Sequence, residues 1–309
     1  MAEFALIDRF FSNLGATRSD VALSIGDDAA LVLPSPGTEI VSVSATLGPK
    51  SVNTWSDQPG SMGHRLLSTT LNRLSAMGAT AAWLTLAITL PTPDETWLEE
   101  FCAAVSALAR RHDLSLVGGD TTSGPLLTTA VVTGMAPAGT VVSTHGARPG
   151  DRILVSGTLG AAALATLSTA HPHRFEPAER EGAARRLAFP TPRVEIAQHL
   201  HLFATAAADL SDGLSNGLDR LLKHEDVGVS VDLSRLPVAD SLRVIVVEMN
   251  LWTHLLNAAG DHEVCVCVPA TRVEELCAAG TRIGVNYAEI GVVEAKPGLR
   301  LTNQPGGKQ

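Results

Sequence analysis

The chain has 309 residues, of which 45% are apolar, 18% charged and 4% aromatic. This composition excludes a largely disordered chain and describes a globular protein whose core is built mostly from Ala, Leu and Val. The formal net charge of -9 opposes a phosphate backbone at long range, so we expect no nucleic-acid partner. No apolar run approaches the roughly 18 residues of a membrane span, so we expect a cytoplasmic protein with no membrane contact.

The first half of the chain alternates helical and β-like segments. Apolar residues at helical spacing predict a helix over 3–13, and alternating apolar and small polar residues predict a strand over 39–47. A helix over 62–77, a strand over 81–90 and a helix over 94–112 follow. The segment TTAVVTGMA then forms another strand.

A polar turn at 146–151 separates the two halves of the chain. We place the domain boundary just before it, which gives an N-terminal domain over 1–145 and a C-terminal domain over 146–309. In the second half, helices at 178–188 and 240–249 are among those predicted around strands such as EVCVCVPA. Because strands and helices mix without a strict βαβ rhythm, we expect an α+β fold in two domains rather than a doubly wound sheet.

Three acidic segments stand out, each read as an apolar strand followed by Gly or Asp and a turn. They are Gly26-Asp27-Asp28, Gly118-Gly119-Asp120-Thr121-Thr122 and Asp209-Leu210-Ser211-Asp212-Gly213. Clustered aspartates repel one another unless a cation lies between them, and oxygen-only ligands suit Mg²⁺ bound to nucleotide phosphates. Glycine lets backbone N–H groups approach a phosphate. Each segment alone is an ordinary turn, but together they indicate a metal and phosphate site.

Several motifs, in this order, resemble those of the thiamine-monophosphate kinase family. They are GDD near residue 28, LSAMGA at 74–79, AWLTLAITLP at 82–91, GGDTTSGP at 118–125, GARPGD at 146–151 and DLSDGL at 209–214. The likeness covers roughly residues 3–295. It implies a two-domain α+β fold like aminoimidazole ribonucleotide synthetase. It also implies an N-terminal sheet that dimerises with a second copy, and ATP bound beside that interface.

The resemblance also implies roles for individual residues. It implies metal ligation by Asp28, Asp120, Asp209 and Asp212, and nucleotide contacts by Gly119, Asp120, Ser211 and Thr46. The cofactors implied are ATP and Mg²⁺, and the partner is a small-molecule substrate. We expect the catalytic groups to be Asp120 and Arg73.

Two positions depart from the family pattern. The family has an aspartate where this chain has Ala45, and another where it has Arg73. Phosphoryl transfer depends on charge neutralisation, and a guanidinium about 4 Å from a cation costs roughly 4 kcal/mol per unit charge at an effective dielectric near 20. We therefore expect fewer metal ions than in the family. Arg73 either clamps phosphate in place of a metal or forms a structural ion pair with Asp28 or Asp120.

The thiamine-contacting positions differ as well. The family's Gly-Asn-His segment, which meets thiamine, falls at about Lys50 to Val52, and its substrate-contacting glutamate aligns with Gly260. The family's arginine that is expected to contact ATP aligns with Thr144. These differences favour a diverged ATP-dependent enzyme that phosphorylates or activates a small molecule other than thiamine monophosphate, for example a carboxylate or amide. The alternatives are a genuine thiamine-monophosphate kinase and a non-catalytic family member that acts as a binding protein.

Overall fold

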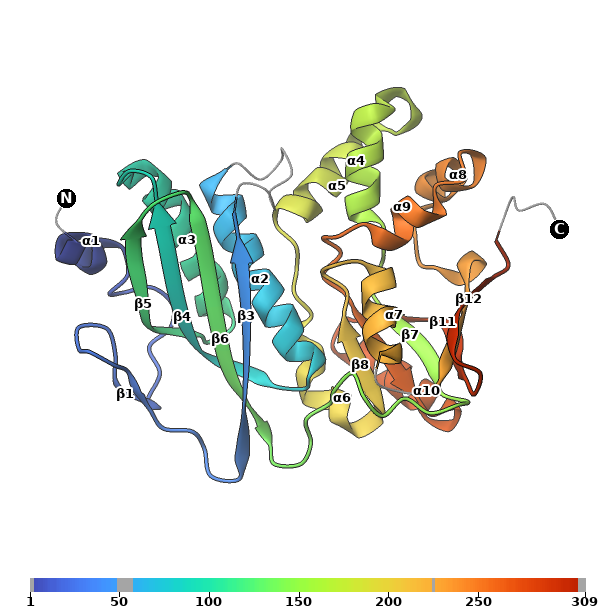
Figure 1. The fold of residues 1–309 in the computed structure, drawn as a ribbon, viewed down its shortest axis with the longest axis horizontal. Coiled ribbons are helices and arrows are strands. Elements are labelled where there is room, and N and C mark those ends of the chain that lie inside the picture. The colour runs from blue at the N-terminus through green and yellow to red at the C-terminus, as the bar shows by residue number, and fades with distance from the viewer. Residues whose placement is uncertain (1–2, 49–57, 224–225, 305–309) are drawn as a thin grey trace. The chain divides into compact units, whose positions relative to one another are not determined.

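The computed structural model describes residues 3–48, 58–223 and 226–304. It divides into two compact units (Figure 1). The first consists of Met1–Ser75 and Ala79–Thr140, and the second of Ala76–Gly78 and Val141–Gln309. The positions about Lys50 to Val52 lie outside the described residues.

The first unit is a four-stranded sheet with a two-stranded hairpin and three helices. The helices are α1 (Glu3–Phe10), α2 (Pro59–Ala76) and α3 (Glu95–Arg111). The strands are β1 (Val21–Leu23), β2 (Leu31–Val32), β3 (Thr38–Leu47), β4 (Thr80–Leu90), β5 (Ser115–Ser123) and β6 (Leu127–Pro137). The sheet has the order β3-β6-β4-β5, with β4 and β5 parallel and the other neighbours antiparallel, while β1 pairs with β2.

One face of this sheet is buried, and buried residues alternate with more exposed ones along its strands. In β6, every second residue from Thr128 to Ala136 is buried, and α2 and α3 lie behind the sheet in Figure 1. The two helices contribute fully buried side chains such as Leu66 and Phe101. Asp94 precedes α3 and accepts a hydrogen bond from the Trp97 N–H at 3.1 Å, which caps the helix.

The segment Gly118 to Thr122 differs from its prediction as a turn. It lies inside β5, which pairs in parallel with β4 from Trp83 to Leu90. The prediction of a turn is wrong here because Gly119 allows close packing against the Leu86 backbone of β4 rather than a chain reversal.

The second unit contains a six-stranded mixed sheet of order β12-β9-β11-β7-β10-β8. Its strands are β7 (Arg152–Ser156), β8 (Ala206–Asp209), β9 (Gly228–Asp232), β10 (Val264–Val268), β11 (Tyr287–Glu294) and β12 (Gly298–Thr302). Its α-helices are α4 (Ala161–Ala170), α5 (Pro177–Ala188), α6 (Ala197–Phe203), α7 (Leu214–Leu222), α8 (Asp240–Glu248), α9 (Trp252–Asn257) and α10 (Val273–Arg282). Short 3₁₀ helices span Pro172–Arg174, Val194–Ile196, Leu233–Arg235 and Ala270–Arg272.

Strands β7 and β10 are buried on both faces, which explains the apolar runs at residues 153–155 and 264–268. Cys265 and Cys267 join one core cluster, while Val264 and Val266 join the other. Burial raises the pKa of the Cys265 thiol to about 12, so this cysteine behaves as a small apolar residue.

Both units mix sheet and helix, so the prediction of an α+β fold is confirmed. No helix in the described part of the chain is long and apolar enough to span a bilayer.

Candidate functional site

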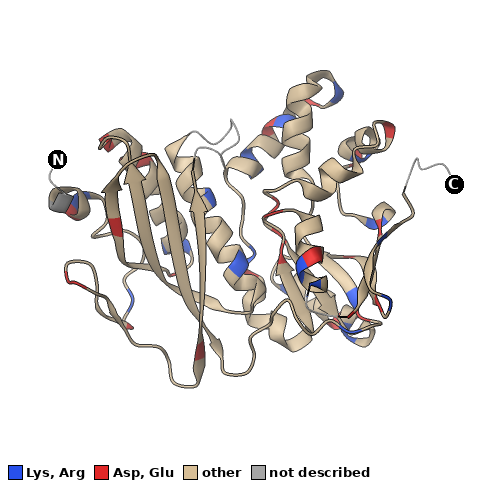
Figure 2. Ribbon diagram, in the orientation of Figure 1, with Lys and Arg blue, Asp and Glu red and all other residues tan. Residues whose placement is uncertain are grey.

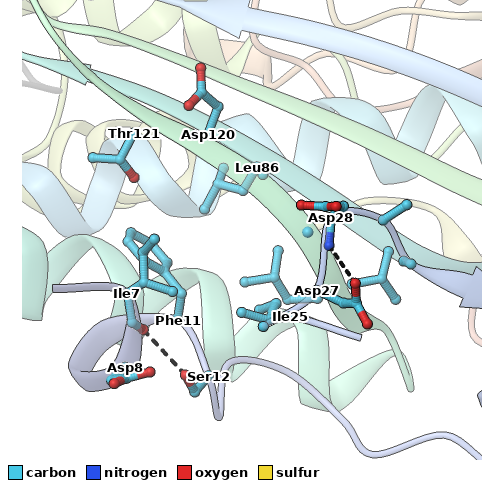
Figure 3. Close-up of a pocket in the computed structure, with 17 residues that line it drawn as sticks. Ile7, Asp8, Phe11, Ser12, Ile25, Asp27, Asp28, Leu86, Asp120 and Thr121 are labelled. Atoms are coloured by element: carbon cyan, nitrogen blue, oxygen red, sulfur yellow. Dashed lines mark hydrogen bonds between the residues drawn. The ribbon is translucent and has the colours of Figure 1, made fainter. Parts of the chain in front are cut away.

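A pocket of about 650 Å³ lies beside β5 in the first unit (Figure 3). Helix α1 lines it with Ile7, the turn after α1 with Phe11, the loop after β1 with residues 25–30, and β5 with residues 116–121. The lining therefore combines apolar side chains with the carboxylates of two acidic motifs. Its volume falls within the range of about 300–1,000 Å³ that small-molecule sites have.

The pocket brings together Asp28, Gly119 and Asp120, three of the predicted site residues. Gly26 has φ of 111°, a left-handed conformation that turns the chain. The Asp28 N–H donates to Oδ1 of Asp27 at 2.8 Å, which stabilises this turn. Asp28 and Asp120 are both exposed, and Figure 3 shows the Asp120 carboxylate pointing away from the Asp27–Asp28 turn.

Carboxylate oxygens are ligands that suit Mg²⁺, so this lining fits a hydrated cation bound with a phosphate. Within the described residues, however, no three His, Cys, Asp or Glu side chains form a group that could hold a metal ion.

The two glycines of β5 have different roles. A Cβ atom on Gly119 would lie 1.9 Å from the Leu86 carbonyl oxygen, so the sheet itself requires glycine there. A Cβ atom on Gly118 would meet nothing within 4 Å among the described residues. Gly118 therefore leaves backbone open to a ligand. The family resemblance implied a nucleotide contact by Gly119, which adjoins Gly118 on the same strand.

Thr46 lies on the same face of the sheet as Asp120 but at the opposite edge. The register aligns Thr46 with Thr129, Thr129 with Ala87, and Ala87 with Asp120. Three inter-strand spacings of about 4.8 Å put the ends of this row roughly 14 Å apart. The Thr46 hydroxyl lies 2.9 Å from that of Thr129, so the two share a hydrogen bond.

The two positions that depart from the family pattern lie close together. Arg73 is in the last turn of α2, and its Nη1 donates to the Ser44 carbonyl oxygen at 3.4 Å. Ser44 immediately precedes Ala45, whose side chain is buried. Arg73 thus lies beside β3, the strand in which Ala45 replaces the family's aspartate.

The third acidic motif belongs to the second unit, at the end of β8. Asp209 is only 4% exposed, and its carboxylate accepts from the Ser211 hydroxyl. Arg220 donates to the Asp209 carbonyl oxygen. Asp212 is exposed, and Gly213 follows with φ of 96°. Asp209 therefore stabilises the turn internally, while Asp212 faces solvent.

A buried acidic segment lies beside this turn and was not among the predicted site residues. Asp261 accepts from the backbone N–H of Gly160 and, at 3.0 Å, of Ala161 at the start of α4. Burial raises the pKa of Asp261, whereas the hydrogen bond from the Gly160 N–H opposes the rise. Glu263 is fully buried and pairs with two arginines. The only signal for it was the weak motif DHEVCV.

Comparisons with known proteins assign the chain to a broad class. Models described as AIR synthase related protein match the chain at residues 26–140 for the N-terminal domain and 148–303 for the C-terminal domain. The two α+β units and the acidic pocket are thus those of an AIR synthase related protein.

Closer relatives define the family within that class. The chain is 38% identical over 299 residues to thiamine-monophosphate kinase of Escherichia coli O157:H7, which covers 95% of this chain and 90% of the relative. The crystal structure of thiamine-monophosphate kinase from Stenotrophomonas maltophilia K279a matches with a TM-score of 0.86 and 34% identity, over 99% of this chain and 98% of that chain. The structure of AaThiL complexed with AMPPCP and TMP matches with a TM-score of 0.73 and 23% identity, over 93% of this chain and 89% of that chain. The chain belongs to the thiamine-monophosphate kinase family.

These findings confirm the resemblance drawn from the motifs. They also correct the preferred prediction of a diverged enzyme with another substrate, which is wrong. The relatives that match most of the chain at 38% identity are thiamine-monophosphate kinases. The physical reason is that Ala45 and Arg73 change one corner of the first unit, where Arg73 contacts Ser44, and leave the pocket beside β5 in place.

Proposed function

We propose that the chain is a thiamine-monophosphate kinase, which transfers the γ-phosphate of ATP to thiamine monophosphate and forms thiamine diphosphate and ADP. The observation that carries the proposal is the identity of 38% over 95% of the chain. The pocket that joins Asp28 to Asp120 supports it, because it combines apolar surface with carboxylates in a volume suited to a nucleotide.

We assign the nucleotide and its metal to the acidic motifs. Asp28 and Asp120 would hold Mg²⁺, which when bound neutralises phosphate charge, and Asp209 and Asp212 are the further metal ligands proposed. Gly119 and its neighbour Gly118 would offer backbone N–H groups to the nucleotide. Within the first unit, Thr46 is a further proposed nucleotide contact, and within the second unit Ser211 is a proposed nucleotide-binding residue.

Arg73 takes the role of a phosphate clamp in this proposal. Its guanidinium carries a fixed positive charge beside the strand where the family has an acid, and a guanidinium can bind phosphate oxygens in a bidentate manner. The lower number of metal ions follows from the same substitution and stays a prediction.

We also propose that the chain is a homodimer and that its domains divide at residues 145 and 146. The open face of the β3-β6-β4-β5 sheet supports the dimer, because its strands expose small and hydroxyl side chains such as Ser44 and Thr85. Two such faces can pack at about 10 Å, the usual spacing of stacked sheets.

A coupled assay tests the proposed activity. With ATP and Mg²⁺, we expect ADP formation that depends on thiamine monophosphate, with thiamine diphosphate detected by chromatography. Asp120→Asn should lower kcat by about 100-fold or more, because phosphoryl transfer depends on charge neutralisation. Asp113→Asn is the matched control, because this carboxylate is 74% exposed, in the same unit, and paired with Arg18. ADP formation that thiamine monophosphate does not accelerate would contradict the proposal.

A further inference from the structure

Glu263, directly before β10, is a fully buried carboxylate held by two arginines. Arg193 donates through Nε to Oε2 at 2.6 Å and through Nη2 to Oε1 at 2.5 Å. Arg186 donates through Nη2 to Oε1 at 2.7 Å. The contact with Arg193 is bidentate, which is the strong and directional form of this ion pair.

The neighbouring backbone is built around this carboxylate. The Ser156 hydroxyl donates to Oε2 at 2.6 Å and accepts from the Val264 N–H at 2.9 Å. A Cβ atom on Gly157 would lie 2.3 Å from Oε1, so glycine is required where the chain passes Glu263. The position of Glu263 is therefore fixed on several sides.

Glu263 and its neighbours in turn fix the backbone of the Asp209–Ser211 turn. The Glu263 carbonyl oxygen accepts from the Leu210 N–H at 2.9 Å, and the Gly260 N–H donates to the Ser211 carbonyl oxygen at 2.8 Å. Val264 is the register partner of Asp209 in the sheet. Backbone contacts on both sides of Leu210 thus come from residues 260–264.

From this geometry we infer that Glu263, clamped by Arg186 and Arg193, is a positioning residue for phosphoryl transfer. It fixes residues 260–263, which fix the turn that carries Ser211 and Asp212. The inference deepens the proposed function and rests on it, because the turn matters for catalysis only if it meets the nucleotide.

An ionic clamp supplies orientation here rather than extra stability. Buried ion pairs often stabilise a fold no better than apolar residues of the same volume, because desolvation offsets their attraction. The forked geometry of Arg193 and Glu263, however, permits only one placement of the carboxylate. A small displacement of groups that contact a substrate, of about 1 Å, can slow a reaction about 100-fold.

The test uses Glu263→Gln and the milder Arg193→Lys, which keeps the charge but loses the fork. We expect kcat, corrected for the folded fraction, to fall by about 100-fold in the first and by about 10-fold in the second. Amide hydrogen exchange over residues 206–214 should be faster in both than in the wild type, and exchange over residues 80–90 should be unchanged.

Asp151→Asn is the matched control. Asp151 is a buried carboxylate of the same unit that accepts from the Thr205 hydroxyl at 2.6 Å. Its loss should lower Tm and leave the kcat of the folded protein unchanged. The inference is overturned if exchange over 206–214 matches the wild type in both variants, or if kcat stays within about threefold. A wild type with no activity on thiamine monophosphate refutes the proposed function instead, and the exchange data still decide whether Glu263 positions the turn.

Discussion

Asp20 shows how a single carboxylate anchors the first unit. Arg18 donates to its two oxygens at 2.9 and 2.7 Å, and Trp83 Nε1 donates to Oδ1 at 3.3 Å. The side chains of Arg18 and Asp20 are only 16% and 19% exposed. The hydrogen bond from Arg18 lowers the pKa of Asp20 below its usual value, although partial burial opposes this shift.

Replacement of Asp20 tests this anchor. Asp20→Asn should lower the free energy of unfolding by about 1.5–3 kcal/mol at pH 7, as expected for a charged hydrogen bond. Because the folded-state pKa lies below the unfolded-state value, the stabilisation is complete above about pH 4 and is lost as the pH falls through the folded-state pKa. Urea unfolding of both proteins from pH 7 to pH 3 measures it. A difference of constant size over this range would contradict the assignment.

At the scale of the element, β5 contains two adjacent glycines with different requirements. Gly119→Ala should destabilise the first unit by several kcal/mol, because the new Cβ atom meets the Leu86 carbonyl oxygen at 1.9 Å. Gly118→Ala has open space and should change Tm little. It should raise the KM for ATP, because the Gly118 backbone belongs to the proposed nucleotide site. Thermal unfolding and initial rates measure the two effects. Equal Tm values for the two variants would show that Gly119 is not confined by β4.

The elements that the sequence predicted well are those with strong local periodicity. The helix predicted over 94–112 is α3, and the strand predicted over 81–90 is β4. The last strand, β12, was not predicted, because it depends on parallel pairing with β9, which is distant in sequence. Local pattern carries little information on such long-range pairing.

In the candidate site, too, local features were predicted better than contacts between residues distant in sequence. The motifs around Asp28 and Asp120 were predicted to meet, and they line one pocket because each is a short segment attached to a strand. The clamp on Glu263 was not predicted, because Arg193 and Arg186 lie 70 and 77 residues away in sequence. Isolated arginines give no sign of such a pairing until the fold brings them together.

At the scale of the whole molecule, the open face of the first sheet is almost without charge (Figure 2). Strands β4 and β6 contain no charged residue, β3 contains Glu39 alone and β5 contains Asp120 alone. The hairpin of β1 and β2 packs on Trp83 at one end of this face through Val21 and Val32. The remainder of this face exposes small and hydroxyl side chains such as Ser44 and Thr85, which suits the proposed packing against a second copy.

The proposed dimer can be broken at the centre of this face. Val131 is half-buried in β6 and pairs across the sheet with Ser44 and Thr85. Val131→Arg should therefore place an unpaired charge between two packed sheets, where desolvation is costly, and shift the protein from a dimer to the 32.3 kDa monomer. Light scattering after gel filtration measures the mass. Ala103→Arg, on the exposed side of α3, should remain dimeric. A wild type that elutes as a monomer at micromolar concentration, or a Val131→Arg variant with the dimer mass, would exclude this face as the interface.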